Sequence, residues 1–401
     1  DRGRKVRERR AARYMSEAAF GVASGCGGEL AVATRTSSAA TSARARATRV
    51  ADGAWSIAGR RLRRVQAACG FREADRARKV VSMAASEHAA GRVGFLGLGI
   101  MGMPMALNLV NKAGRELVVW NRDAAKSSQL RDAVPSGAVE IASSPKEVVQ
   151  RCDVTFVMLS TPHAVHQVLL EMPDAAVHGV TSGKSVVDCS TITESDSRRS
   201  HDAIVAAGGR FLEAPVSGSK VPAENGALVF LAGGDRGLFD RVDSGGEQLL
   251  QAMGKKSVFL GDIGAGARMK LAVNMIMGSM IAALGEGIML CERNDLPVGA
   301  LLDVLDAGAM ANPMFRMKGG NMSQEKRKYA PHFPLEHAQK DMRFALQMGD
   351  CSNTSMPVAA AANECFKKAK AQGHARSDFS AVVEALRGGM ADSSDEPVSE
   401  K

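Results

Sequence analysis

The stretch Gly97-Leu98-Gly99-Ile100-Met101-Gly102 carries three glycines in the pattern GxGxxG. A short apolar run at residues 93–96 precedes it, and residues 104–111 continue it with helical character. In a strand–turn–helix of this kind, the first glycine allows the tight turn, the second lets the backbone approach a pyrophosphate, and the third allows close helix–strand packing. We therefore expect residues 97–102 to bind a dinucleotide at the N-terminus of a helix, whose partial positive charge favours phosphate.

The end of the next expected strand, residues 117–120, indicates which dinucleotide is bound. NAD-binding turns usually have Asp or Glu about 20 residues after the glycines, where it holds the ribose 2′-hydroxyl. This chain has Asn121 and Arg122 there, followed by Asp123, which we expect to cap the next helix. An amide and a guanidinium offer donors to a 2′-phosphate, which a carboxylate would repel. The sequence therefore predicts NADP(H) as the cofactor.

Short apolar segments alternate with helical segments from residue 91 to about residue 264. This alternation is typical of βαβ units and a parallel sheet. After Gly266 the strand pattern stops, and a long helix is expected over residues 271–293. We predict an α/β fold, an N-terminal Rossmann-like doubly wound sheet followed by an all-α C-terminal domain. The expected strands are residues 93–96, 117–120, 154–159, 185–187, 211–213, 227–232 and 257–260, and the later helices lie near 297–308, 336–348, 357–372 and 378–387.

The predicted organisation has four parts. Residues 1–90 are rich in Arg, Ala and Ser and poor in acids, which is typical of an organellar transit peptide. A location in a plastid or mitochondrion would follow, whereas a start at Met83 would leave the protein in the cytoplasm. Residues 91–263 are the predicted NADP-binding domain, residues 264–390 the helical domain, and residues 391–401 a disordered tail.

Composition argues against several classes of partner. Residues 1–90 hold 19 of the 52 Lys and Arg residues and 8 Asp and Glu residues, whereas residues 91–401 hold 33 Lys and Arg and 35 Asp and Glu. Because the excess positive charge lies in residues 1–90, it does not support a nucleic-acid partner for the rest of the chain. The seven cysteines form no CxxC pair, and His163 and His166 lack a third ligand type, so no metal site is expected. The apolar run 271–290 contains Asn274 and Glu286, which favours a buried helix over a membrane span.

Three further motifs follow the glycine turn in a fixed order. They are Asp188-Cys189-Ser190-Thr191, Ala214-Pro215-Val216-Ser217-Gly218-Ser219, and the segment Gly264 to Asn274, in which Lys270 and Asn274 share one helix face. With the glycine turn, they resemble the β-hydroxyacid dehydrogenase family over residues 91–390. Within it, the chain is most similar to the plant-type glyoxylate/succinic semialdehyde reductases. Residues 214–223, 270–280, 308–315 and 356–366 carry this closer similarity, and Phe333-Pro334-Leu335-Glu336-His337-Ala338-Gln339-Lys340-Asp341-Met342 also fits it.

The resemblance implies roles for individual residues. Lys270 would protonate the carbonyl oxygen as the hydride arrives, and Asn274 would orient Lys270 or the substrate hydroxyl. Ser217 and the Gly218 backbone would bind the substrate carboxylate, and Thr191 would place the substrate and the nicotinamide. The other implied cofactor contacts, besides residues 97–102, Asn121 and Arg122, are Leu159, Ser160, Phe333, Lys340 and Asp341.

The implied activity is NADPH-dependent reduction of glyoxylate to glycolate and of succinic semialdehyde to 4-hydroxybutyrate. The resemblance also implies a homo-oligomer. One alternative is a 3-hydroxyisobutyrate-type NAD(P)-dependent dehydrogenase, although that activity usually goes with NAD and an acid at position 121. A second is a non-catalytic interaction module, but such relatives lose the lysine that this chain keeps. An imine reductase is disfavoured for the same reason. Considered one at a time, Lys270, Asn274 and Ser217 would be interpreted as a surface lysine, a core amide and a turn residue. Only the order of their motifs along the chain indicates a site.

Overall fold

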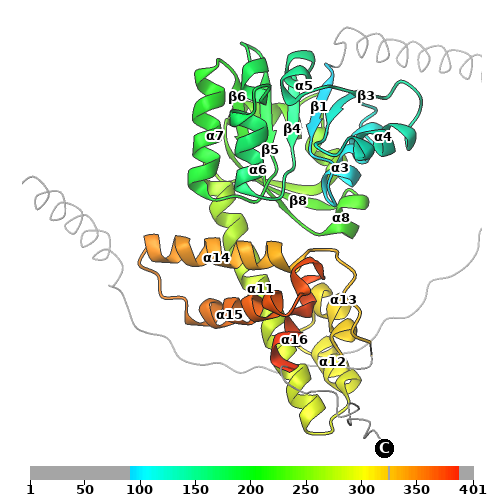
Figure 1. The fold of residues 1–401 in the computed structure, drawn as a ribbon, viewed down its shortest axis with the longest axis vertical. Coiled ribbons are helices and arrows are strands. Elements are labelled where there is room, and N and C mark those ends of the chain that lie inside the picture. The colour runs from blue at the N-terminus through cyan, green and yellow to red at the C-terminus, as the bar shows by residue number, and fades with distance from the viewer. Residues whose placement is uncertain (1–90, 324–325, 388–401) are drawn as a thin grey trace, which may run out of the picture. The chain divides into compact units, whose positions relative to one another are not determined.

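The computed structural model describes residues 91–323 and 326–387, and all of these belong to one compact unit (Figure 1). The predicted leader, residues 1–90, and the predicted tail, residues 391–401, lie outside the described residues. The described chain begins with a sheet flanked by helices and ends with helices alone, as the sequence predicts.

Six parallel strands form the first part of the sheet, in the order β3-β2-β1-β4-β5-β6. Five of them match expected strands, although β4 is shorter than expected. The sixth, β3, was missed because it has only three residues at the edge of the sheet, with an exposed isoleucine at its end. The bounds are β1 (Val93–Leu96), β2 (Leu117–Trp120), β3 (Val139–Ile141), β4 (Val154–Val157), β5 (Ser185–Asp188) and β6 (Arg210–Glu213).

The last three strands correct the expectation of a wholly parallel sheet. Strand β8 (Leu228–Gly234) runs antiparallel to β6, and the unpredicted β7 (Val216–Ser217) runs antiparallel to β8. The chain between β6 and β8 contains only β7 and the five-residue α8 (Lys220–Glu224). A parallel connection needs a longer crossover, usually a helix. Strand β9 (Gly254–Phe259) then pairs parallel to β8.

Helices cover both faces of the sheet, so its strands are buried on both sides (Figure 1). All four residues of β1 are buried, and its alternate side chains enter different cores, with Phe95 in one and Leu96 in the other. The helices of this region are α3 (Gly102–Asn111), α4 (Ala124–Asp132), α5 (Pro145–Arg151), α6 (Pro162–His166), α7 (Glu194–Ala206), α9 (Arg236–Asp243) and α10 (Leu249–Met253).

Helix α11 (Ala265–Arg293) is the central element of the helical region. Among the described residues it alone is long and apolar enough to cross a membrane. It nevertheless packs against β8 and against all five later helices of the described chain, α12 to α16, so it is a core helix of this fold. An unpredicted helix, α13, holds two glycines and no apolar period, so no local pattern indicated it. The remaining helices are α12 (Val298–Ala307), α13 (Pro313–Met322), α14 (Leu335–Cys351), α15 (Pro357–Ala371) and α16 (Val382–Arg387).

Candidate active site

The glycine turn between β1 and α3 has the geometry that a pyrophosphate requires. Gly97 has φ of +97°, and a Cβ there would lie 2.4 Å from the Met158 carbonyl oxygen. At Gly102 a Cβ would lie 1.9 Å from the Gly97 carbonyl oxygen, so this helix start needs glycine. At Gly99 a Cβ would meet no atom within 4 Å, which leaves space for a ligand to reach the backbone. The turn therefore fits a dinucleotide.

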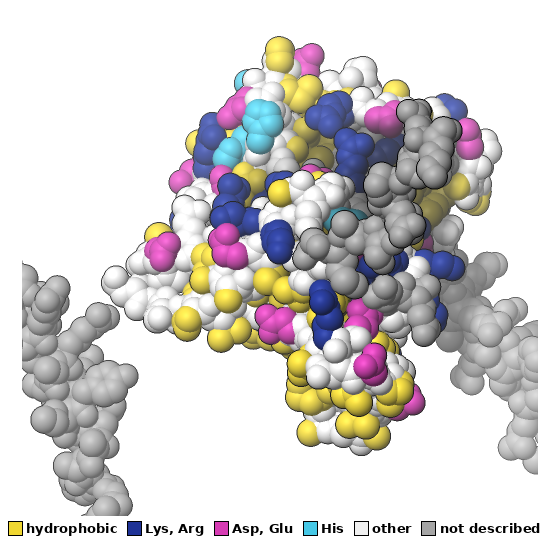
Figure 2. Space-filling view, turned by 60° about the horizontal axis from the view of Figure 1, so that its bottom comes forward, with side chains coloured by type: hydrophobic (Ala, Val, Ile, Leu, Met, Phe, Trp, Pro, Cys, Tyr) yellow, Lys and Arg dark blue, Asp and Glu magenta, His cyan; other side chains and the backbone are white. Residues whose placement is uncertain are grey.

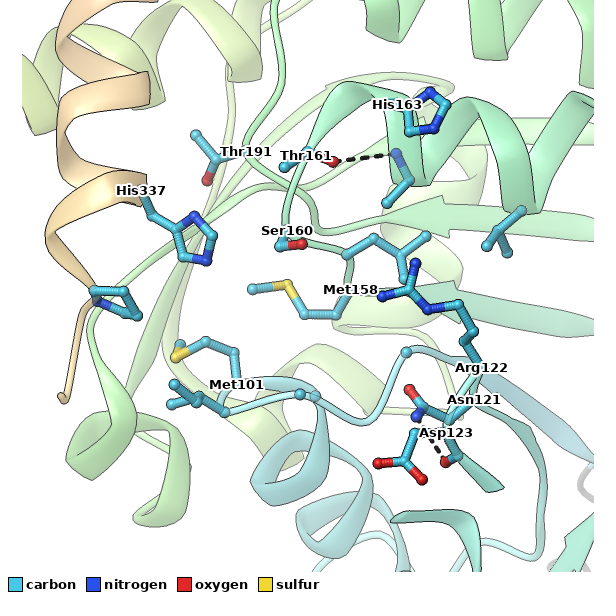
Figure 3. A pocket seen from close by; sticks show the side chains of 18 of the residues that line it. Met101, Asn121, Arg122, Asp123, Met158, Ser160, Thr161, His163, Thr191 and His337 are labelled. Carbon is cyan, nitrogen blue, oxygen red and sulfur yellow. Dashed lines mark hydrogen bonds between the residues drawn. The ribbon is translucent and has the colours of Figure 1, made fainter. Parts of the chain in front are cut away.

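A pocket of about 830 Å³ opens on this turn (Figure 3). Figure 3 shows Asn121 and Arg122 at one end of it and Thr191 and His337 at the other. We call these the cofactor end and the catalytic end. The predicted cofactor residues that line the pocket are Gly97, Gly99, Ile100, Met101, Gly102, Asn121, Arg122, Leu159, Ser160, Thr191, Phe333, Lys340 and Asp341.

At the cofactor end, Asn121 organises the glycine turn. Its Oδ1 accepts the Leu98 N–H at 2.8 Å, and its Nδ2 donates to the Asp123 carbonyl oxygen at 2.9 Å. Leu98 itself is buried and does not line the pocket. The Asp123 carboxylate accepts the Ala125 N–H and caps α4, as expected from the sequence.

Two cations stand at this end. Arg122 and Lys126 both line the pocket and are exposed, and neither forms an ion pair with any residue in the described part of the chain. Arg122 was predicted from the sequence, whereas Lys126 was missed. The available signal was a second cation in the first turn of the helix that directly follows Arg122.

At the catalytic end, three buried side chains form a chain of hydrogen bonds. Lys270 Nζ donates to Asn274 Oδ1 at 2.8 Å, and Asn274 Nδ2 donates to Asp341 Oδ2 at 2.7 Å. Lys270 is 6% exposed and Asp341 2%. Burial lowers the pKa of Lys270 to about 8, against the opposing effect of Asp341. The carboxylate thus holds the amide, and the amide holds a lysine that can exchange its proton near neutral pH.

Lys340 connects α14 to the sheet. Its Nζ donates to the Thr191 carbonyl oxygen at 2.6 Å and lies 3.1 Å from Asp341 Oδ1. Thr191 follows β5, at the carboxyl edge where open α/β sheets hold ligands. Lys340 therefore joins the loop after β5 to the carboxylate that orients Asn274.

Besides Leu98, four predicted residues do not line the pocket: Lys270, Asn274, Ser217 and Gly218. The first two adjoin it through Asp341. Ser217 is half-buried on β7, and β7 contacts α11, the helix of Lys270. Gly218 has φ of +134°, and a Cβ there would lie 2.7 Å from Leu228 Cδ2, so only glycine suits this turn.

Sequence reasoning missed the support behind Phe333. Asp378, which is 2% exposed, accepts the backbone N–H groups of His332 and Phe333 at 3.1 and 3.2 Å. It also forms an ion pair with the buried Lys318 at 2.7 Å. His332 and His337 line the pocket as well, and burial lowers the pKa of His337. No local pattern marks Asp378, because its partners come from other segments.

Comparison with known proteins agrees with this arrangement. Residues 92–261 match the family model described as the NAD binding domain of 6-phosphogluconate dehydrogenase. Residues 264–386 match the model described as NAD-binding of NADP-dependent 3-hydroxyisobutyrate dehydrogenase.

Similar chains include two from Arabidopsis thaliana. Glyoxylate/succinic semialdehyde reductase 1 is 48% identical over 295 residues, covering 74% of this chain and 98% of that protein. Glyoxylate/succinic semialdehyde reductase 2, chloroplastic, is 47% identical, covering 74% and 79%. The human cytokine-like nuclear factor N-PAC is 42% identical, and the match spans 73% of this chain and 51% of that protein.

Among solved structures, 3-hydroxyisobutyrate dehydrogenase from Salmonella typhimurium is 27% identical with a TM-score of 0.65, covering 73% of this chain and 99% of that one. The two family models together span most of the chain, and the match covers 98% and 79% of the two plant relatives. The predicted family, fold class and nicotinamide dinucleotide are confirmed, and the substrate is a small molecule. The chain belongs to the β-hydroxyacid dehydrogenase family and is an NAD(P)-dependent oxidoreductase.

Proposed function

We propose that the chain reduces small aldehydes that carry a carboxylate, glyoxylate and succinic semialdehyde, with NADPH as the hydride source and Lys270 as the proton donor. The observation that carries the proposal is the buried Lys270–Asn274–Asp341 chain beside the dinucleotide pocket. The names of the two plant relatives support the substrates.

Bound NADPH would supply the hydride that adds to the carbonyl carbon. As the C=O π bond breaks, its electron pair goes to the oxygen, and Lys270 Nζ delivers a proton there. A lysine with a pKa of about 8 is largely protonated at neutral pH and still acidic enough to donate. Asn274 fixes the direction of the ammonium group, and Asp341 fixes the amide. The positive charge also stabilises the developing alkoxide.

The preference for NADPH rests on the cofactor end. Arg122 and the neighbouring Lys126 present two cations near the end of β2, where an NAD enzyme has a carboxylate. A 2′-phosphate would pair with both of them. Residues 97–102, Asn121, Leu159, Ser160, Thr191, Phe333, Lys340 and Asp341 would hold the rest of the dinucleotide.

The carboxylate of the substrate would bind at Ser217 and the Gly218 backbone. The Ser217 hydroxyl has no hydrogen-bond partner within residues 91–323 and 326–387, and β7 contacts the helix of Lys270. Thr191 would orient the substrate from the loop after β5. A short aldehyde acid held there would present its carbonyl oxygen to Lys270.

A second candidate is oxidation of 3-hydroxyisobutyrate. It is supported by the second family model and by the 27% identical solved structure. The same Lys270 would then accept the hydroxyl proton. The absence of an acid at position 121 favours the reductase.

The third possibility, a non-catalytic interaction module, draws support from the similarity to N-PAC. However, this chain keeps the lysine and its hydrogen-bonded partners, so we rank catalysis first.

The test is steady-state turnover of NADPH and NADH with glyoxylate and succinic semialdehyde, and of NAD and NADP with 3-hydroxyisobutyrate. Lys270→Met is compared with Lys255→Met, a matched change at an exposed lysine on β9. Aldehyde reduction that prefers NADPH and is lost only in Lys270→Met is the expected result. Faster oxidation of 3-hydroxyisobutyrate would favour the second candidate, and no turnover of any substrate would favour the third.

We also propose that residues 1–90 direct the chain to a plastid or mitochondrion. Their composition supports this, as does the chloroplastic relative. Fusion of these residues to a fluorescent protein tests it, and a cytoplasmic signal would contradict it.

A homo-oligomer and a division into domains at residue 264 are further parts of the proposal. Helix α12 buries none of its residues and exposes Val304, and Figure 2, which turns the end carrying α12 forward, shows hydrophobic side chains gathered there. Light scattering would measure the oligomeric state, and a monomer would contradict the proposal.

The proposed division into domains falls between β9 and α11. Two separate calorimetric unfolding transitions, rather than one, would support it.

A further inference from the structure

A buried carboxylate at the edge of the sheet holds the start of the helix that carries Lys270. Glu213, the last residue of β6, is 2% exposed. Its Oε1 accepts the backbone N–H groups of Gly264, Gly266 and Ala267 at 2.8, 2.7 and 3.2 Å. These N–H groups belong to the N-cap and the first turn of α11, where helices leave donors without an intrahelical partner and carry partial positive charge.

Glycines surround this carboxylate where a side chain would crowd it. A Cβ at Gly233 would lie 2.7 Å from Glu213 Oε1, and one at Gly266 would lie 3.1 Å from it and 2.2 Å from the Leu231 carbonyl oxygen. Gly264 has φ of +95°. The second oxygen, Oε2, accepts the Ser197 hydroxyl from α7. Glu213 thus joins β6, α7 and α11 at one point.

This point is close to the chemistry along the helix. Lys270 follows Gly266 by four residues, which is about 6 Å of helix, and Asn274 follows by one more turn. Because a helix is stiff, a small slide or rotation of its first turn carries over to Lys270 Nζ. A displacement of 1 Å at a reacting group is enough to lower a rate about a hundredfold.

We propose that Glu213 is a positioning residue for the proton donor: its contacts with the first turn of α11 set where Lys270 lies relative to the sheet-borne pocket. The inference rests on the proposed function, in which Lys270 donates the proton. Asp188, the neighbour of Glu213 on β5, has a parallel role, because its Oδ1 accepts the Ser190 N–H next to Thr191. The two strand ends thus hold the two segments that meet at the catalytic end.

The test compares Glu213→Ala, Glu213→Gln and Ser197→Ala in the full chain. Glu213→Ala should lower kcat about 10- to 100-fold while the NADPH dissociation constant, measured by fluorescence titration, stays within about twofold. Glu213→Gln keeps an acceptor oxygen, so it should recover most of kcat. Ser197→Ala leaves the three backbone contacts intact and should stay within about threefold of the wild type.

A second readout follows Lys270 directly. Competitive labelling with acetic anhydride across pH, read by mass spectrometry, reports the pKa of individual lysines without any bound cofactor. In the wild type Lys270 should titrate near 8, and in Glu213→Ala it should move toward the ordinary lysine value, because a displaced helix lets water reach it. Lys255 should titrate alike in both.

A wild-type kcat in Glu213→Ala together with an unchanged titration of Lys270 would overturn the inference. A loss of kcat in Glu213→Gln as large as that in Glu213→Ala would overturn it too. If Glu213→Ala does not fold, Glu213→Asp decides, because the shorter side chain keeps the carboxylate but draws it away from the three backbone N–H groups. Reduced kcat with unchanged NADPH binding supports the inference, and wild-type kcat overturns it. Wild-type protein and Lys270→Met are measured alongside, so an enzyme inactive on every aldehyde would count against the proposed function instead.

Discussion

The two ends of the pocket differ in how they are built. At the cofactor end, the glycine turn, Asn121 and Arg122 belong to consecutive elements of the sheet, and both cations are exposed. At the catalytic end, buried groups from β5, α11 and α14 meet, with no more than a few percent of Lys270 or Asp341 reaching solvent. Water screens charges at the first end and not at the second. We therefore expect graded effects from changes at the cofactor end and severe ones at the catalytic end.

The largest effect should come from Lys270→Met. Loss of the proton donor should lower kcat for aldehyde reduction about a thousandfold, with little change in NADPH binding. The fold should persist, because removing a buried lysine with a lowered pKa relieves a desolvation cost. Stopped-flow single turnover and thermal unfolding measure both. A loss of NADPH affinity as large as the loss of kcat would contradict the separation of the pocket into a cofactor end and a catalytic end.

Next in size is Asp378→Ala, which acts on the wall of the pocket. The change leaves Lys318 buried without its ion-pair partner and frees the His332 and Phe333 N–H groups. The free energy of unfolding should fall by roughly 3–5 kcal/mol. The matched control is Asp306→Ala, which removes an exposed ion pair with Arg316, a residue of α13 like Lys318. It should lower the free energy of unfolding by only about 0–1 kcal/mol. Equal losses in urea denaturation would contradict the role of burial.

A smaller effect is expected from Arg122→Ser at the cofactor end. Loss of one of two exposed cations should raise KM for NADPH about 10- to 30-fold, as for one charge-assisted contact of about 1.5–2 kcal/mol. KM for NADH and kcat should change little. Arg131→Ser, at an exposed arginine of α4 outside the pocket, serves as the control. An equal rise in KM for NADPH and for NADH would show that Arg122 does not bind the 2′-phosphate.

The mildest test changes only pH. In the proposed mechanism the protonated form of Lys270 donates in reduction, and this form predominates below its pKa of about 8. The kcat for reduction should thus be level near pH 6–7 and fall about tenfold per pH unit above about 8. Oxidation of the product should show the reverse dependence, because it needs the neutral amine. A reduction profile that stays level up to pH 10 would exclude Lys270 as the donor.

Much of the fold was predictable because its signals are local. The glycine spacing, the apolar strands and the long helix α11 are properties of neighbouring residues, and five of the six parallel strands were found in this way. Strand β3, strand β7 and helix α13 were missed, since they are short or lack an apolar period. The antiparallel pairing of β8 was missed for another reason: direction depends on the connection and not on the strand itself.

The candidate site divides in the same way. The dinucleotide turn, Arg122 after β2 and the shared helix face of Lys270 and Asn274 were predictable from the sequence, because each depends on residues a few positions apart. The tertiary structure was needed to show that Asp341 holds Asn274 across 67 residues and that Lys340 reaches Thr191 across 149. It also placed Glu213 beneath α11 and Asp378 behind Phe333. Such contacts follow from how the helices pack against the sheet, and no local pattern of side chains encodes that packing.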